Sequence, residues 1–181
     1  MKTLLSSFLF WCSFVFMLSC SSQSYLDPQT VESLVEKQQF TFMARRALPT
    51  NYEAVNALNH LPGATPNRLL DLDYGYSIVL KENTLEVTLP YYGRRFFPAS
   101  DPNQNSFRFR SEKFTVERSI GKKGKKILLI RPQDRQYVQR IIIEIHPNGS
   151  AFTSIEASDR QPISYDGYLM ANEENKNRSS E

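Results

Sequence analysis

The sequence predicts a mainly β domain, an antiparallel meander of about eight strands preceded by a short helix. Apolar and polar residues alternate in one run after another, which is the period of strands with one buried face. Tight turns join the runs, and one of them contains Asn148-Gly149, a pair typical of hairpins. Several runs have only four to seven residues, whereas a strand that crosses a membrane needs about 9–11. We therefore expect a soluble sheet.

The expected helix opens at Asp27-Pro28, which combines a favoured N-cap residue with proline at the first helical position. Val31, Leu34 and Val35 then recur at the spacing of one helix face. We expect this helix to end near Lys37.

The strands begin at Phe40, where the period changes from helical to two, and the first strand ends at Pro49. A long connection with two proline-containing turns follows, in which residues 52–58 suit a helical turn. The other expected strands are residues 76–81, 85–89, 107–110, 114–120, 127–130, 141–145 and 151–157. Closure into a lipocalin-like barrel would remove the exposed edges of such a sheet. The alternative is an open curved antiparallel sheet packed against the helix.

The N-terminal segment predicts export and lipid anchoring. A basic start, Met1-Lys2, precedes an apolar run from Leu4 to Leu18, which is too short to span a bilayer and is typical of a signal peptide. The following residues, Met17-Leu18-Ser19-Cys20, resemble a bacterial lipobox, in which the cysteine thiol is acylated. Several acyl chains on Cys20 would give a stable membrane anchor.

The predicted organisation has four parts. They are a lipoprotein signal peptide (residues 1–19), lipidated Cys20 with its tether (residues 20–26), one β-rich domain (residues 27–170) and a disordered polar tail (residues 171–181). Cleavage after Ser19 would leave Cys20 as the only cysteine, which excludes catalytic thiols, disulfides and cysteine metal sites.

The run after Pro90 is the best candidate for contact with a ligand or a partner. It contains Tyr91, Tyr92, Arg94 and Arg95 and continues into Phe96-Phe97. Aromatic rings stack on flat groups, and guanidinium groups grip carboxylates or phosphates. The alternative is that these side chains only pack at the rim of the barrel. The formal net charge of +3 argues against nucleic acid as a partner.

No catalytic residue or metal site is predicted. The imidazole bases are His60 and His146, both in expected loops, and the chain has no Gly-x-Ser-x-Gly motif. Acidic and amide residues at 101, 103, 105 and 112 have the spacing of a calcium-binding loop, but Ser106 stands where that loop needs glycine. We therefore expect no enzyme activity, no cofactor and no metal.

A basic turn, Gly121-Lys-Lys-Gly-Lys-Lys126, joins two of the expected strands. Its lysines could contact anionic lipid head groups. Alternatively, they only keep the hairpin soluble and block association at the edge of the sheet.

Several elements, in order along the chain, resemble the family of Bacteroidota lipoproteins with a domain of unknown function numbered 4251. They are Phe40-Thr-Phe42, Ala47-Leu-Pro49, Leu89-Pro-Tyr-Tyr-Gly93, Phe107-Arg-Phe109, Asn148-Gly149 and Ile163-Ser-Tyr-Asp-Gly167. The resemblance covers residues 40–168. It implies a small secreted or lipid-anchored protein with a lipocalin-like fold, and it assigns no activity and no catalytic residues.

The functional expectation combines these points. Ser21-Ser22 lacks the acidic cluster linked in such lipoproteins to surface export, which favours the periplasmic face of the outer membrane. We expect an envelope lipoprotein that binds an apolar ligand or an envelope protein without catalysis. The alternatives are a protein-interaction or inhibitor module with a self-filled barrel and, third, an envelope hydrolase.

Overall fold

The computed structural model describes residues 24–50, 56, 70–97 and 106–173. Its elements are α2 (Pro28–Lys37), β1 (Phe40–Pro49), β2 (Ser77–Lys81), β3 (Thr84–Pro90), β4 (Ser106–Ser111), β5 (Phe114–Ile120), the 3-10 turn η3 (Lys122–Gly124), β6 (Lys126–Pro132), β7 (Val138–Ile145), β8 (Ser150–Ala157) and β9 (Arg160–Met170). The short helix is therefore confirmed, with Asp27 as its N-cap accepting hydrogen bonds from the amides of Gln29 and Thr30.

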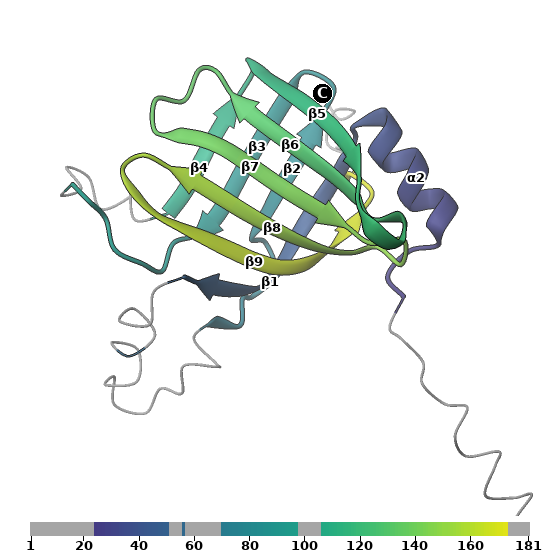
Figure 1. The fold of residues 1–181 in the computed structure, drawn as a ribbon, viewed down its shortest axis with the longest axis horizontal. Coiled ribbons are helices and arrows are strands. Elements are labelled where there is room, and N and C mark those ends of the chain that lie inside the picture. The colour runs from purple at the N-terminus through teal and green to yellow at the C-terminus, as the bar shows by residue number, and fades with distance from the viewer. Residues whose placement is uncertain (1–23, 51–55, 57–69, 98–105, 174–181) are drawn as a thin grey trace, which may run out of the picture.

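The nine described strands form one antiparallel sheet in the order β4-β3-β2-β1-β9-β8-β7-β6-β5. This sheet curls into a nearly closed barrel (Figure 1), which confirms the predicted fold class. β4 and β5 are the two edges and are not hydrogen-bonded to each other. Asp134 ties the β4 edge to the β6–β7 loop, because its carboxylate accepts hydrogen bonds from the Ser111 hydroxyl (2.5 Å) and the Glu112 amide (3.1 Å).

Strand β9 is missing from the sequence prediction although it is the longest, with 11 residues. Pro162 and Gly167 interrupt its pattern, and both residue types are unfavourable inside strands. In the barrel, Pro162 lies beside a register shift in β8, between Ile155 and Ala157, where the ladder is irregular. Because β9 lies between β1 and β8, it joins the two halves of the sheet.

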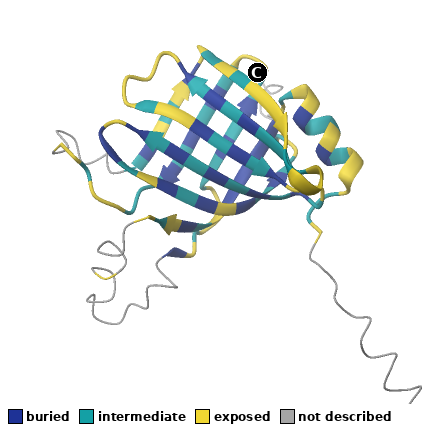
Figure 2. Ribbon diagram, viewed as in Figure 1, coloured by how far each residue is buried: buried dark blue, intermediate teal, exposed yellow. Residues whose placement is uncertain are grey.

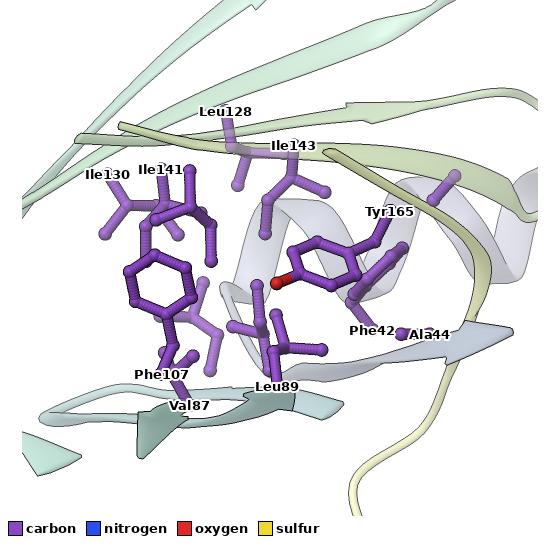
Figure 3. Packing of buried hydrophobic residues seen from close by; sticks show 14 of the residues in the cluster. Phe42, Ala44, Val87, Leu89, Phe107, Leu128, Ile130, Ile141, Ile143 and Tyr165 are labelled. Carbon is purple, nitrogen blue, oxygen red and sulfur yellow. The ribbon is translucent and has the colours of Figure 1, made fainter. Parts of the chain in front are cut away.

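The inward side chains of the strands fill the barrel with apolar atoms. Buried and partly exposed residues alternate along the strands (Figure 2), and side chains from facing strands meet in the interior (Figure 3). Tyr165 is completely buried among them, and its hydroxyl donates to the Pro90 carbonyl at 2.6 Å. Burial raises the pKa of Tyr165 well above its ordinary value. The phenol is therefore a neutral cross-link between β9 and the end of β3.

The outer face is also covered at β1. Thr41 and Met43 alternate with the inward residues, yet both are buried. Asn172 follows β9 and covers this face, since its side chain accepts from the Thr41 hydroxyl and donates to the Leu80 carbonyl, both at 2.9 Å. The rest of the predicted tail, residues 174–181, lies outside the described residues.

The two ends of the barrel differ. At one end, the helix end, α2 lies against the sheet and buries Val31 and Val35 in the core. The opposite end, which we call the mouth, is formed by residues 106–109, 133–137 and 158–160 (Figure 1). Cys20 and the predicted signal peptide lie outside the described residues. None of the described helices is long and apolar enough to cross a membrane.

Gly167 permits the closest backbone approach between β9 and β1. A Cβ atom added at Gly167 would overlap the Met43 carbonyl oxygen, next to the register shift between Ala44 and Arg46. The Gly167→Ala variant should therefore lose about 2–3 kcal/mol of unfolding free energy, measured by urea denaturation.

The matched control is Gly121→Ala, whose new methyl group would press only on the flexible side-chain ends of Ile127 and Lys125 and would lie at an ordinary contact distance of 3.6 Å from the Lys125 carbonyl oxygen. This variant should lose less than about 1 kcal/mol. Equal losses in the two variants would contradict a steric requirement for glycine at 167.

Candidate binding site at the barrel mouth

A pocket of about 470 Å³ opens at the mouth. The start of β4, the β6–β7 loop and the β8–β9 turn surround it. Its apolar wall includes Phe107, Phe109 and Val138, and its charged wall includes Arg95 and Arg160. The pocket thus combines aromatic surface with cationic groups, and its volume falls in the range of roughly 300–1,000 Å³ that is usual for small-molecule sites.

The segment after β3 is positioned by the β8–β9 turn. The Phe96 amide donates to the Asp159 carbonyl at 2.9 Å, and the Gln161 amide donates to the Arg94 carbonyl at 3.0 Å. The Tyr91 hydroxyl donates to the same Arg94 carbonyl at 2.8 Å. These bonds place residues 91–96 across the turn, so that Arg95 lies opposite Arg160 in an isolated antiparallel bridge.

One carboxylate and two guanidinium groups form the polar centre of the pocket. Asp159 Oδ2 accepts from Arg160 Nη2 at 2.8 Å and from Arg95 Nη2 at 2.9 Å. The Asp159 side chain is 3% exposed and that of Arg160 is 8% exposed. Among the residues that the structure describes, the two guanidinium groups share this one buried carboxylate.

The Arg160 guanidinium is also held by aromatic rings. Its central carbon lies 5.0 Å from the centre of the Tyr91 ring and 4.8 Å from that of Phe107, distances at which cation–π attraction operates. Within the described part of the chain, Arg160 Nη1 is buried and has no hydrogen-bond partner. A buried donor without a partner is costly.

Electrostatics keep the cluster charged. Burial raises the pKa of Asp159, but hydrogen bonds from Arg160 and the charges of Arg160 and Arg95 outweigh burial and lower the pKa below its ordinary value. Burial likewise raises the pKa of Tyr91. At neutral pH the centre therefore consists of a carboxylate, two guanidinium groups and a neutral phenol.

The structure divides the residues predicted for contact. Arg95 lines the pocket, whereas Tyr91 lies behind this lining and contacts the Arg160 guanidinium with its ring. Arg94 is exposed, and neither Arg94 nor Tyr92 lines the pocket. Tyr92 is half-buried, and its burial raises the pKa of its phenol, with smaller contributions from Tyr76 and Asp73. The contact role of all four remains a prediction.

The other candidates lie elsewhere. His146 is exposed in the β7–β8 turn at the helix end, and Glu112 is an exposed residue 3.3 Å from Arg110. His60, Asp101, Asn103 and Asn105 lie outside the described residues. Among the residues that the structure describes, no group of three or more His, Cys, Asp or Glu side chains has the geometry to hold a metal ion.

Sequence reasoning missed Asp159 and Arg160. In the sequence they are an adjacent acid–base pair in the expected link after the strand at 151–157, a pattern that is common in surface turns. The tight β8–β9 turn and residues 91–96, which lie across it, bury these two side chains. Local periodicity shows neither feature.

Replacing Asp159 tests the electrostatic role of the cluster. The Asp159→Asn variant leaves two guanidinium groups without their carboxylate, and at pH 7 it should lose about 1–3 kcal/mol of unfolding free energy. Because folding lowers the pKa of Asp159, its contribution is complete above about pH 4 and is lost as the pH falls through the lowered pKa. Denaturation at several pH values should therefore show a smaller acid-induced loss for Asp159→Asn than for the wild type.

The control is Asp71→Asn, which removes an exposed ion pair of 3.7 Å to Arg46. It should change the unfolding free energy by less than about 1 kcal/mol. An unchanged acid profile in Asp159→Asn would contradict the role given to the cluster.

Comparison with known proteins agrees with the fold. A family model described as Domain of unknown function (DUF4251) matches residues 23–169. A crystal structure of a DUF4251 family protein from Bacteroides eggerthii superposes with a TM-score of 0.51 at 12% sequence identity, covering 82% of this chain and 89% of that chain. No curated protein matches the chain. The match confirms the resemblance seen in the sequence: the chain belongs to the DUF4251 family.

Proposed function

We propose that this protein is a lipid-anchored, non-catalytic binding protein of the cell envelope that takes a small amphipathic anion at the barrel mouth. The observation that carries this proposal is Arg160, a buried arginine that lines the mouth pocket and whose Nη1 has no hydrogen-bond partner among the described residues. A carboxylate, sulfonate or phosphate oxygen is the acceptor that best suits a guanidinium nitrogen.

The ligand's apolar part is inferred from the pocket wall. Phe107, Phe109 and Val138 offer hydrocarbon and aromatic surface beside the charged groups. The barrel interior is packed with its own side chains, and eight-stranded barrels of similar size hold either such a core or one small ligand. The apolar ligand expected from the sequence would therefore bind at the mouth and not inside the barrel. It would also carry an anionic group, placed near Arg160.

The place of action is proposed from the sequence. Acylation of Cys20 would hold the domain at the periplasmic face of the outer membrane. The described chain starts at Ser24, close to the proposed anchor. A binding protein fixed at that surface would meet ligands that diffuse through the periplasm.

A second candidate function is protein binding at the mouth. Phe96 and Phe97 are 54% and 63% exposed, and Tyr137 across the pocket is 51% exposed. Exposed aromatic side chains are common at the centre of protein interfaces. This arrangement supports the interaction or inhibitor module as the alternative. Nothing in the described residues favours an envelope hydrolase.

A fluorescent amphipathic anion tests the ligand site. Anilinonaphthalene sulfonate should bind the purified protein, with its rings against the apolar wall and its sulfonate near Arg160. Decanoate should displace it, and decanol, which has the same chain without the charge, should displace it much less. Equal displacement by the two would contradict recognition of an anionic group.

Two variants in the same titration locate the contact. Arg160→Gln should weaken binding roughly tenfold to a hundredfold, because it removes a charged hydrogen bond. Arg135→Gln changes a partly exposed pocket residue whose contacts, with Asp134, the Arg110 carbonyl and the Phe109 ring, all lie at the rim of the mouth, so it should weaken binding without unfolding the protein. Arg131→Gln on the outer face is the control and should bind normally. Unchanged affinity in Arg135→Gln and Arg160→Gln would refute the proposed site.

The anchor is tested in the full chain. Cys20→Ser removes the thiol that would carry the lipid, so the variant should lose labelling by a fatty-acid analogue and, unlike the wild type, leave the lipoprotein fraction of the envelope. Labelling of the wild type and the variant to the same extent would show that Cys20 is not the acylated residue.

A further inference from the structure

The basic turn at the helix end has two lysines without an ionic partner among the described residues. Lys125 and Lys126 are paired at 2.5 Å with Glu144 and Glu32, respectively. In contrast, Lys122 and Lys123 are exposed, and no ion pair or hydrogen bond in the described part of the chain involves their side chains. Lys122 and Lys123 thus make the outermost part of the turn cationic, and Glu36 of α2 lines a groove with Ile120.

An apolar side chain adjoins this cationic turn. Ile120, the last residue of β5, is 75% exposed and precedes η3 by two positions. Exposed isoleucine beside unpaired lysines suits the interface of a bilayer, where apolar groups enter the acyl boundary and ammonium groups stay among the phosphates.

The chain approaches the barrel from the proposed anchor at this same end. The amides of Tyr25 and Leu26 donate to the Asn148 carbonyl in the β7–β8 turn, at 2.9 and 3.2 Å. The neighbouring Pro147 lies 3.8 Å from the Cβ position of Gly124 in the basic turn. Figure 1 shows α2, the first described residues and the β5–β6 turn at one end of the barrel.

The short link limits how far the barrel can be from the lipid. Tyr25 follows Cys20 by five positions, so a fully extended chain would place their Cα atoms at most about 18 Å apart. A domain held this closely must turn one surface toward the head groups. The helix end is the surface from which the chain leads to Cys20.

We propose that Ile120, Lys122 and Lys123 dock the helix end of the barrel onto the anionic leaflet that holds Cys20, so that the mouth faces away from the membrane. The inference rests on the lipid anchor of the proposed function and is independent of the ligand at the mouth. Negative head groups supply the charge that the two lysines lack, and the bilayer interface covers Ile120.

Lipid quenching of two single-cysteine probes tests this orientation. The acylated full-length protein would be reconstituted into vesicles of phosphatidylethanolamine with or without phosphatidylglycerol, each containing a spin-labelled lipid. A fluorophore at Ser119→Cys reports the helix end, and one at Gln139→Cys reports the mouth end, since both positions are exposed. We expect strong quenching at 119 and weak quenching at 139, with the difference larger in anionic vesicles and smaller at high salt.

Substitutions identify the docking residues. Lys123→Gln, combined with the probe at 119, should lower the ratio of docked to undocked protein roughly fivefold in anionic vesicles. Ile120→Ser should also lower it. Lys113→Gln, an exposed lysine near the β6–β7 loop, is the matched control and should leave the ratio unchanged.

The outcomes separate the two proposals. If the protein fails to float with the vesicles, the lipid anchor is wrong and the docking inference falls with it. If the protein floats but the probes at 119 and 139 are quenched equally, or Lys123→Gln and Lys113→Gln behave alike, the docking inference alone is refuted.

Discussion

Dense packing inside the barrel is the constraint on which the rest of the structure depends. The inward faces of the strands meet in a buried apolar core, and Tyr165 connects β9 to the end of β3 through this core. Native interiors are packed as tightly as organic crystals, so a core of this kind has little room for a guest. Binding is therefore expected at the mouth, because the other end is covered by α2.

The mouth obtains its charge from an unequal ion cluster. Asp159 has to be charged to hold both Arg95 and Arg160, because these two guanidinium groups share its carboxylate within the described part of the chain. Burying an ion pair is seldom a gain in stability by itself, because desolvation costs about as much as attraction returns. The rings of Tyr91 and Phe107 offset part of the cost of burying Arg160 by cation–π contact, and under the proposed function the guanidinium of Arg160 would recognise an anion.

The two ends of the barrel suit different tasks. The N-terminal chain reaches the barrel through Tyr25 at the helix end, which also carries the exposed lysines of η3, whereas the pocket lies at the far ends of the same strands. If the helix end docks on the membrane, as proposed, the tethered domain would keep one orientation relative to the bilayer without a rigid linker. The domain would then present its pocket and its exposed aromatic residues, Phe96 and Phe97, to the compartment and not to the membrane.

The sequence by itself determined the fold class, the helix and eight of the nine described strands, because the alternation of apolar residues follows directly from burying one face of each strand. It also placed Tyr91 and Arg95 among the contact candidates. Only the tertiary structure decided that β9 passes through Pro162 and Gly167, since an irregular ladder and a close backbone approach tolerate them. Only the tertiary structure brought Asp159 and Arg160 to Arg95. Arg95 and Asp159 are 64 positions apart in the sequence, and local periodicity contains no information on such long-range pairing.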